Sequence, residues 1–478
     1  MRNAECRTVG QCGVRSPESG VGGAWTRISI LLLIAHVAVA ATTQPARPNI
    51  VFVFTDDQAP GMTGYEGNVD IKTPNLDRLA SESSRFMRCY APTPQCAPSR
   101  ASVLTGMYPH RHGVTTNGGL LPVGADTIAS RLTRAGYACG VVGKWHLPPG
   151  NAARPGLGFD AYSAMHGEGW AWRDSPVWVN GEERKADKYL TDWDTDRAIE
   201  FIEQSKDQPF FLWLCYNAPH TPLDYPPETE SLYPPEGLTI PDVVDAGTLY
   251  PGQLQQSVPV AEFRKLKSTP DELRRRRSKY YAMITQVDRN VGRLLEQLTS
   301  TGVAENTVVI FASDNGWALG ENALYSKGPL FVDALARVPM LIRDPRRAKG
   351  GATVDRVVSL VDLAPTILEI AGLEPPPTMH GRSLTRLLDD RDDPRHVDEC
   401  FLEYDKQKGK EYQARGIVTA NYKFVDYQRE VDMMFDLQRD PDETRNVAND
   451  PVYTSIVTVL RSRLEAWRKQ TRDPQTWR

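Results

Sequence analysis

The sequence has no excess of positive charge and no apolar run long enough to span a membrane comfortably. Its 56 lysines and arginines face 60 aspartates and glutamates, and the formal net charge of −4 offers no basic field that could hold nucleic acid. The apolar stretch at residues 28–40 is shorter than a bilayer span. It follows Arg27 and ends in Ala-Val-Ala at 38–40, the small-x-small pattern of a signal-peptidase site. We therefore predict a signal peptide over residues 1–40, an exported (periplasmic or secreted) protein, and no membrane anchor in the mature chain.

Cysteine is scarce. The sequence has seven cysteines, two of which fall within the predicted signal peptide. The odd number that remains in an exported protein indicates a cysteine with a role other than disulfide formation. Cys139 and Cys215 lie in apolar, strand-like runs and are predicted to be small buried side chains. The other three are Cys89, Cys96 and Cys400.

Four short, continuous apolar runs predict buried parallel strands. They are Ile50–Phe54, Cys139–Val142, Phe210–Cys215 and Val308–Ala312. Helical periodicity lies between them, at residues 75–85, 194–203 and about 274–299. Strands that alternate with helices predict an α/β domain with a large, mostly parallel sheet covered by helices on both faces. We assign this domain to residues 46–375.

The sequence changes character after three prolines at 375–377. Strand candidates at 399–404, 416–419 and 422–427 precede a final helix near 452–469, and they predict a smaller C-terminal α+β subdomain over residues 376–478. Two earlier segments, 151–184 and 219–270, are predicted to be long loops of the kind that shape a binding cleft. The run Arg274–Arg277 is predicted to be a solvated helix face or a helix start.

Polar side chains follow each of the four predicted core strands. The strand ends carry Asp56 and Asp57, Lys144 and His146, His220, and Asp314 and Asn315. Ligands of open α/β sheets bind beyond the carboxyl ends of the strands, so these side chains are expected to share one site. The oxygen donors among them suit calcium or magnesium better than zinc. Helix capping and turn formation would explain one isolated pair of aspartates, but the matching strand ends favour a metal site.

Cys96 begins a segment, Cys-Ala-Pro-Ser-Arg at 96–100, that precedes a run compatible with a helix. Pro98 suits the first turn of a helix. A cysteine at that position would lie at the positive end of the helix dipole and near Arg100, and both favour the thiolate. These residues predict a reactive thiol, and a buried structural cysteine is the alternative.

The same segment resembles a family signature. Cys96-Ala-Pro-Ser-Arg-Ala-Ser-Val-Leu-Thr-Gly106 is similar to the signature of the type I, formylglycine-dependent sulfatases of the alkaline phosphatase superfamily. The segments at 140–146, 218–220, 326–327 and 422–423 resemble further family motifs in the same order. One departure is Gly-Glu-Asn-Ala at 320–323, where many relatives have Gly-Glu-His-Gly. The resemblance extends over nearly the whole mature chain and implies an alkaline-phosphatase-like fold.

The resemblance also implies cofactors. Cys96 would be oxidised to formylglycine by a separate formylglycine-generating enzyme and would then be the nucleophile toward a sulfate ester. A calcium ion would be held by Asp56, Asp57, Asp314 and Asn315 together with the group at position 96.

The remaining catalytic roles follow from the same resemblance. Arg100 and Lys144 would orient and polarise the hydrated aldehyde, and His146 would be the base for its second hydroxyl. His220 and Lys327 would bind the sulfate together with Lys144 and would help to protonate the leaving oxygen.

The expected substrate is a sulfated small molecule or glycan, with a sulfated polysaccharide favoured because polymers are met outside the cytoplasm. Trp170, Trp172 and Arg173 lie in one predicted loop and would offer flat aromatic surface and charge to a sugar. Trp317, close behind the metal motif, is a further candidate for the cleft. The alternative is that these tryptophans are packed in the core or within loops.

Three competing functions need to be weighed. The first is hydrolysis of phosphonate monoesters or phosphodiesters, which relatives in the same superfamily carry out with a similar cysteine motif. The second is glycan binding by a chain that is never matured, which the complete set of predicted site residues disfavours. The third is a zinc phosphatase, which the small number of eight histidines disfavours, because paired histidine ligands are missing beside the carboxylates.

Overall fold

The structure is a computed structural model that describes most of the chain from Arg47 onward. Described are residues 13, 15 and 47–474, except 123, 148–156, 160, 167–170, 227, 243–244, 251, 266–268, 348–349, 408–409 and 429–430. Apart from residues 13 and 15, the predicted signal peptide lies outside the described residues. Among the described helices, none combines the length and the apolar character needed to cross a membrane.

A single large sheet forms the centre of residues 46–478. The four predicted core strands are present as β1 (Asn49–Thr55), β3 (Ala138–Lys144), β7 (Phe210–Cys215) and β8 (Thr307–Ser313). Strand β1 pairs in parallel with both β7 and β8, and β3 pairs in parallel with β7. All four strands are buried almost throughout their length, which is why their sequences are continuously apolar. The prediction of a mostly parallel, buried sheet is confirmed.

The sheet extends beyond the predicted strands on both sides. The full order is β12-β2-β11-β8-β1-β7-β3-β4-β5-β6, with β13 paired to β2. The added strands are β2 (Ser84–Tyr90), β4 (Tyr162–His166), β5 (Pro176–Val179), β6 (Glu182–Lys185), β11 (Arg337–Arg343), β12 (Thr353–Val354) and β13 (Val358–Ser359). Strand β11 is antiparallel to its neighbours, so the sheet is mixed.

The structure corrects three predictions about local structure in part. The helix predicted at 75–85 is α1 (Pro74–Ser81), and the chain turns at its end into β2. The predicted loop at 151–184 contains β4, β5 and β6, and the loop at 219–270 contains α6 (Ala246–Leu249) and α7 (Val258–Lys265). These elements are short and receive their stability from neighbours in the sheet or the core, so a local apolar pattern was too weak to indicate them.

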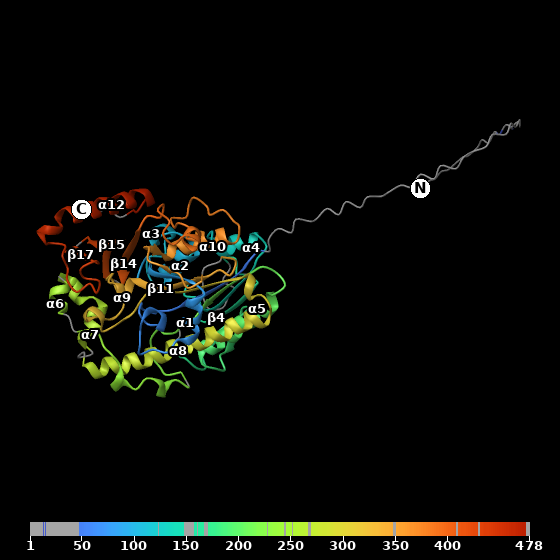
Figure 1. The fold of residues 1–478 in the computed structure, drawn as a ribbon, viewed down its shortest axis with the longest axis horizontal. Helices are drawn as coiled ribbons and strands as arrows, with labels where there is room; N and C mark the ends of the chain where they lie inside the picture. The colour runs from blue at the N-terminus through green and yellow to red at the C-terminus, as the bar shows by residue number, and fades with distance from the viewer. Residues whose placement is uncertain are drawn as a thin grey trace, which may run out of the picture. The chain divides into compact units, whose positions relative to one another are not determined.

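Helices cover both faces of the sheet (Figure 1). Alternate residues of β1 show the division, because Phe52 packs into one hydrophobic cluster and Val53 into another on the opposite face. The helices that pack on the first face are α2 (Cys96–Thr105), α4 (Ile128–Arg134), α10 (Leu363–Ile370) and α11 (Thr385–Asp389). The short helix α3 (Pro109–His112) lies beside α2. The second face carries α1, α5 (Leu190–Ser205) and the long α8 (Pro270–Ser300). Helix α8 begins four residues earlier than predicted, at a proline that follows the capping residue Thr269.

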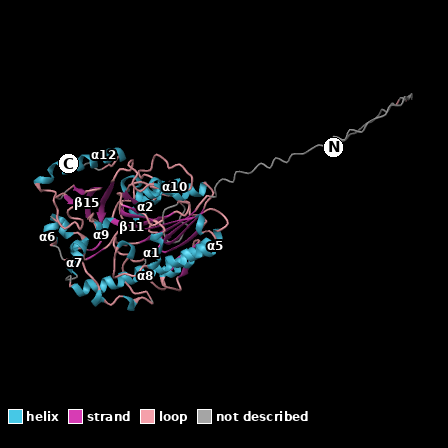
Figure 2. Cartoon of the chain, viewed as in Figure 1, coloured by secondary structure: helices cyan, strands magenta, loops and turns pink. Residues whose placement is uncertain are grey.

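A smaller antiparallel sheet follows near the C-terminus (Figure 2). Its order is β14 (Glu399–Gln407), β15 (Lys410–Thr419), β16 (Tyr422–Tyr427) and β17 (Met433–Asp436). Helix α12 (Thr454–Thr471) packs against it through Leu464 and Trp467. The predicted α+β character of this region is confirmed, while its boundary at residue 376 stays a prediction.

Parallel pairing brings the carboxyl ends of β1, β3, β7 and β8 to one edge of the sheet. Two of these strands approach very closely there. Gly143 has a positive φ of 93°, and a Cβ atom built on it would lie 2.0 Å from the carbonyl oxygen of Cys215 in β7. Only glycine permits this approach, which sets the position of Lys144.

We predict that Gly143→Ala lowers the free energy of unfolding by about 1–3 kcal/mol more than Gly136→Ala does, because it forces β3 and β7 apart. Gly136 is a matched control, since it also has a positive φ (89°) but no heavy atom within 4 Å of a built Cβ. Urea denaturation of both variants measures the difference, and equal losses of stability would contradict the close approach.

Candidate active site

Three buried carboxylates and one cysteine form the centre of the site. Asp56 and Asp57 follow β1, Asp314 follows β8, and Cys96 is the first residue of α2. One ligand atom from each of the four lies within 4.8 Å of all the others. The three aspartates are completely buried and Cys96 is 1% exposed.

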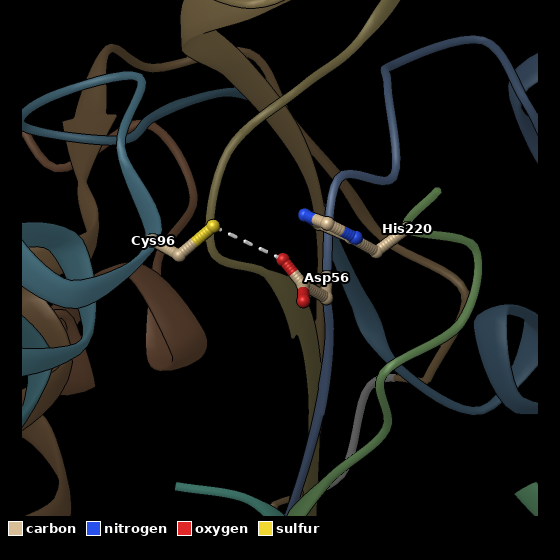
Figure 3. Close-up of side chains that lie close together, drawn as sticks. All are labelled: Asp56, Cys96 and His220. Carbon is tan, nitrogen blue, oxygen red and sulfur yellow. Dashed lines mark hydrogen bonds between the residues drawn. The ribbon is translucent and has the colours of Figure 1, made fainter. Parts of the chain in front are cut away.

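Cys96 contacts both an anion and a cation. Its Sγ atom lies 3.2 Å from Oδ1 of Asp56 and 2.6 Å from Nζ of Lys327. Figure 3 shows the side chains of Cys96, Asp56 and His220 grouped together, each from a different segment of the chain. A second set of possible ligand atoms is formed by these three residues.

Each aspartate is paired with a buried cation. The guanidinium of Arg100 donates to Oδ2 of Asp314 at 2.9 Å, and Lys144 donates to Asp56. Lys327, in the turn after β10 (Tyr325–Ser326), donates to Asp57. Because each pair joins distant parts of the chain, the cluster holds the ends of the core strands together.

Burial and the neighbouring charges shift the pKa values of these groups. Burial raises the pKa of Asp57 to about 6, with Asp56 adding to the shift and Lys327 opposing it. Burial and the charge of Asp56 likewise raise the pKa of Asp314 to about 6, against the effect of Arg100. For Asp56 itself burial would raise the pKa, but Lys144 and other cations outweigh it and hold the pKa well below its usual value.

The expectation of a thiolate at Cys96 was wrong for this structure. Burial, and then the charge of Asp56, raise the pKa of the thiol well above its ordinary value. Arg100 lies on the same helix but is directed to Asp314 and to the carbonyl oxygen of Lys144. Helix position alone therefore gave the wrong direction for the pKa of the thiol, because the sequence could not show how deeply Cys96 is buried or how close Asp56 lies to it.

The donor set fits a hard divalent cation. Oδ2 of Asp57 is buried and makes no hydrogen bond to any described residue, although Nε2 of His220 lies 3.6 Å away. Asn315 donates from Nδ2 to Oδ1 of Asp57 at 2.6 Å, and its own Oδ1 lies 3.5 Å from Nζ of Lys327. Carboxylate and amide oxygens at such spacing are the ligands that calcium and magnesium take.

The two histidines predicted for the site lie in loops beyond β3 and β7. His146 follows β3 by two residues, is partly buried and has a positive φ of 53°. Nδ1 of His220 lies 2.5 Å from the carbonyl oxygen of Thr221, so it donates there. Burial, and then the charge of Lys144, lower the pKa of His220 to about 4, so its ring is neutral at pH 7.

The predicted sugar-binding loop is only partly described. Trp170 lies outside the described residues. Trp172 is 5% exposed, stacks on Tyr189 at 5.4 Å and donates from Nε1 to the carbonyl oxygen of Pro222. This packing disfavours Trp172 as an open surface for a sugar ring. Arg173 is half-exposed and lies 3.3 Å from Asp224.

Some contributions to the site escaped the sequence analysis. The hydroxyl of Tyr280, in α8, donates to the carbonyl oxygen of Asp57 at 2.5 Å and accepts from the amide of Ala59. Ser99 donates to the carbonyl oxygen of Asp314 at 2.6 Å. Both fix the backbone of the aspartate loops. Ser99 lies inside the signature at residues 96–106 and could have been proposed from it. Tyr280 is one of several aromatic residues on a long helix, and nothing in the sequence distinguishes it from the others.

The departure from the family motif at 322–323 faces away from the cluster. Asn322 donates from Nδ2 to the carbonyl oxygens of Asp442 and Glu443, near the C-terminal sheet. Both Asn322 and Ala323 have positive φ values, 51° and 55°. The difference from the family motif at these two positions therefore changes the contact between this turn and the C-terminal region, not the cluster of aspartates.

Comparisons with known proteins agree with this geometry. A family model described as Sulfatase matches residues 48–373, and one described as N-sulphoglucosamine sulphohydrolase, C-terminal, matches residues 320–470. The chain is 29% identical over 517 residues to N-acetylglucosamine-6-O-sulfatase of Bacteroides thetaiotaomicron, covering 93% of this chain and 91% of that protein.

Solved structures share the fold. One, a protein in complex with its substrate D-glucosamine-2-N,6-O-disulfate, superimposes with a TM-score of 0.79 at 28% identity over 89% of this chain and 98% of that one. Phosphonate monoester hydrolase of Agrobacterium radiobacter superimposes with a TM-score of 0.74 at 24% identity over 89% of this chain and 96% of that one. The second likeness shows the fold alone.

We predict that Arg100→Met lowers the free energy of unfolding by about 3–5 kcal/mol, because it leaves the carboxylate of Asp314 buried without its partner. Arg134→Met serves as the control, since Arg134 pairs with Asp126 on the surface, and it should cost less than about 1 kcal/mol. Denaturant titration compares the two variants. Similar losses would show that the Arg100 pair does not hold the site together.

Proposed function

The chain belongs to the sulfatase family and is a sulfuric ester hydrolase, and from that premise we propose that it removes sulfate from sulfated carbohydrates, using a formylglycine at position 96 and a bound calcium ion. The observation that carries the proposal is the position of Cys96, whose Sγ atom contacts both the carboxylate of Asp56 and the ammonium of Lys327. A nucleophile formed at this position would stand next to both a metal site and a cation that can bind sulfate.

Calcium would be held by Asp56, Asp57, Asp314 and Asn315, together with the group at position 96. When bound, it would bind a sulfate oxygen and neutralise charge on the ester. The three aspartates are balanced by three cations in this structure: Arg100, Lys144 and Lys327. A divalent ion would therefore give the site a net positive charge, which suits an anionic ester.

In this proposal, Sγ of Cys96 marks the place of a hydroxyl of the hydrated formylglycine. That group would supply one hydroxyl to attack sulfur and a second whose deprotonation releases the sulfate. Because Cys96 is 1% exposed in the folded chain, the formylglycine-generating enzyme would have to reach it before folding is complete.

Side chains of the protein would orient and protonate the reacting groups. Lys144 contacts Asp56 and Lys327 contacts Asp57, so both ammonium groups are within reach of a ligand at position 96. His220 is neutral in the structure, and the charge of a bound sulfate would raise its proton affinity, which suits a donor to the leaving oxygen. Arg100 would hold the cluster through Asp314, and His146 would be the base for the second hydroxyl.

The carbohydrate substrate is supported by the relative named N-acetylglucosamine-6-O-sulfatase and by the solved structure that holds D-glucosamine-2-N,6-O-disulfate as its substrate. The chief rival is hydrolysis of a phosphonate monoester or a phosphodiester. The fold does not discriminate, and a singly charged phosphonate ester would suit the same cluster. The sulfatase model over residues 48–373 favours the sulfate ester. A third possible function is glycan binding without catalysis. It requires a chain in which Cys96 is not converted to formylglycine.

We predict that active protein carries formylglycine at position 96 and that Cys96→Ala lowers kcat at least about 1,000-fold, because the nucleophile is removed. Mass spectrometry of the peptide that contains residue 96 tests the modification. Cys89→Ala is the control, since Cys89 is also buried but packs against Met340. Active protein with only unmodified cysteine would refute the proposal.

The same preparations decide between the rival functions. Release of sulfate from sulfated sugars and from an aryl sulfate is compared with hydrolysis of a phosphonate monoester and a phosphodiester. Preferred hydrolysis of a phosphorus ester would support the rival, and sugar binding without any hydrolysis by matured protein would support a binding function.

We predict that calcium at about one hundred times its Kd stabilises the protein by about 2.7 kcal/mol, and that Asp57→Asn abolishes this effect by removing a charged ligand. Differential scanning fluorimetry with calcium and with a chelator measures the shift in Tm. Asp288→Asn should retain it, because Asp288 belongs to α8 and is buried against the start of α1, where it accepts from the amide of Leu76. A Tm insensitive to chelation, or zinc found by elemental analysis, would contradict a calcium site.

A further inference from the structure

The arginine run at the start of α8 lines a cavity. The sequence predicted a solvated face or helix start for Arg274–Arg277. In the structure, Arg275 and Arg276, with Lys279 one turn further along, line a cavity of about 670 Å³. Its other walls include the aromatic residues Trp317 and Tyr325. Arg277 points elsewhere, since it is buried and paired with Glu321.

This cavity adjoins the candidate active site. Three of its lining residues are close chain neighbours of site residues: Thr221 follows His220, Ser326 precedes Lys327, and Trp317 is two residues beyond Asn315. The rings of His220 and Trp317 are also 6.1 Å apart. A substrate whose sulfate is bound at the cluster can therefore extend into the cavity along this wall.

Arg276 is held in a fixed position in the cavity wall. Its Nη1 donates to the hydroxyl of Tyr325 at 2.7 Å, and its guanidinium lies 4.7 Å from the centroid of the Tyr325 ring. Its Nε donates to Glu272 at 2.8 Å. A cation anchored in this way loses little freedom when it binds an anion.

Positive charge exceeds negative charge on the lining. Glu272 is shared by Arg275 and Arg276, and Glu262 pairs with Lys265, which is not part of the lining. Lys279 makes no ion pair with any of the residues that the structure describes, and its Nζ lies 5.3 Å from the centroid of the Tyr225 ring. The ammonium of Lys279 is therefore available to an anionic ligand.

We propose that Arg275, Arg276 and Lys279 form a second anion-binding subsite, which takes a sulfate or carboxylate group on the sugar that carries the scissile sulfate or on the adjoining sugar. The substrate class is thus a glycan with at least two anionic groups rather than a neutral sugar with one sulfate. This inference rests on the proposed function, because it places the scissile sulfate at the neighbouring cluster. The proposal assigns selectivity between substrates to α8, whereas the sequence analysis predicted that the loop with Trp170 and Trp172 binds the sugar.

The test measures how sugars inhibit the hydrolysis of a small aryl sulfate, which reports binding whether or not the sugars are turned over. The panel pairs singly and doubly charged ligands. It contains N-acetylglucosamine-6-O-sulfate and D-glucosamine-2-N,6-O-disulfate, and glycosaminoglycan disaccharides with one sulfate or with an additional sulfate or uronate. We expect the doubly charged member of at least one pair to bind at least about fivefold more tightly, and the preference to shrink as salt is raised.

Lys279→Gln should reduce that preference about fivefold, because it removes the unpaired cation. Arg289→Gln is the matched control, since Arg289 lies on the same helix, is half-exposed, pairs with Glu228 and does not line the cavity. It should keep the full preference, and Tm values of both variants check that they are folded. A wild-type protein without any preference for the second charge, or the same preference in Lys279→Gln, would overturn the subsite.

The proposed function can fail separately. If matured protein hydrolyses neither the aryl sulfate nor any sugar sulfate, the sulfate-ester proposal fails. Calorimetry of the same sugar pairs with wild type, Lys279→Gln and Arg289→Gln then tests the subsite by itself. Equal affinities for singly and doubly charged sugars in that experiment would overturn it.

Discussion

Charge balance among buried groups at the carboxyl edge of the sheet is the constraint on which the site depends. Asp56, Asp57 and Asp314 are fully buried, and an isolated carboxylate at such a depth would cost several kcal/mol. Their partner cations come from α2, from the end of β3 and from the turn after β10. The cluster is therefore complete only when the sheet, its helices and that turn are in place, so site formation and folding are coupled.

The C-terminal region also supports this cluster. Lys423, in β16, is buried and pairs with both Asp333 and Glu443. Asp333 begins the short helix α9 (Asp333–Ala336), and Leu335 in that helix accepts a hydrogen bond from the amide of Gly316, directly after Asn315. A lysine in the small sheet thus helps to position the loop that carries two proposed metal ligands. The chain departs from the family motif at the same junction, where Asn322 bonds the backbone near Glu443.

The long helix α8 connects structure and proposed specificity. Its apolar face covers the sheet, Tyr280 fixes the loop of Asp57, and Arg277 fixes the turn near Glu321. Arg275, Arg276 and Lys279 of its first turns line the cavity beside the candidate active site. One helix therefore buries core surface, fixes the loop that carries Asp57 and lines the cavity in which we propose the second anion-binding subsite. In our proposal, changes at these surface cations alter substrate selectivity and leave the buried cluster intact.

The sequence by itself determined the four core strands of the large sheet and the residues that we predict for the active site. Continuous apolar runs located β1, β3, β7 and β8, because strands buried on both faces exclude polar residues. Polar residues at their ends, and the segment that begins at Cys96, indicated which side chains come together at one edge of the sheet. Only the tertiary structure decided what depends on distant neighbours: the pKa of Cys96, raised by burial and then by Asp56, the burial of Trp172 against Tyr189, and the additional strands β4 and β11. Such properties arise from contacts between side chains and strands that are far apart in the sequence. A local sequence pattern does not indicate those contacts.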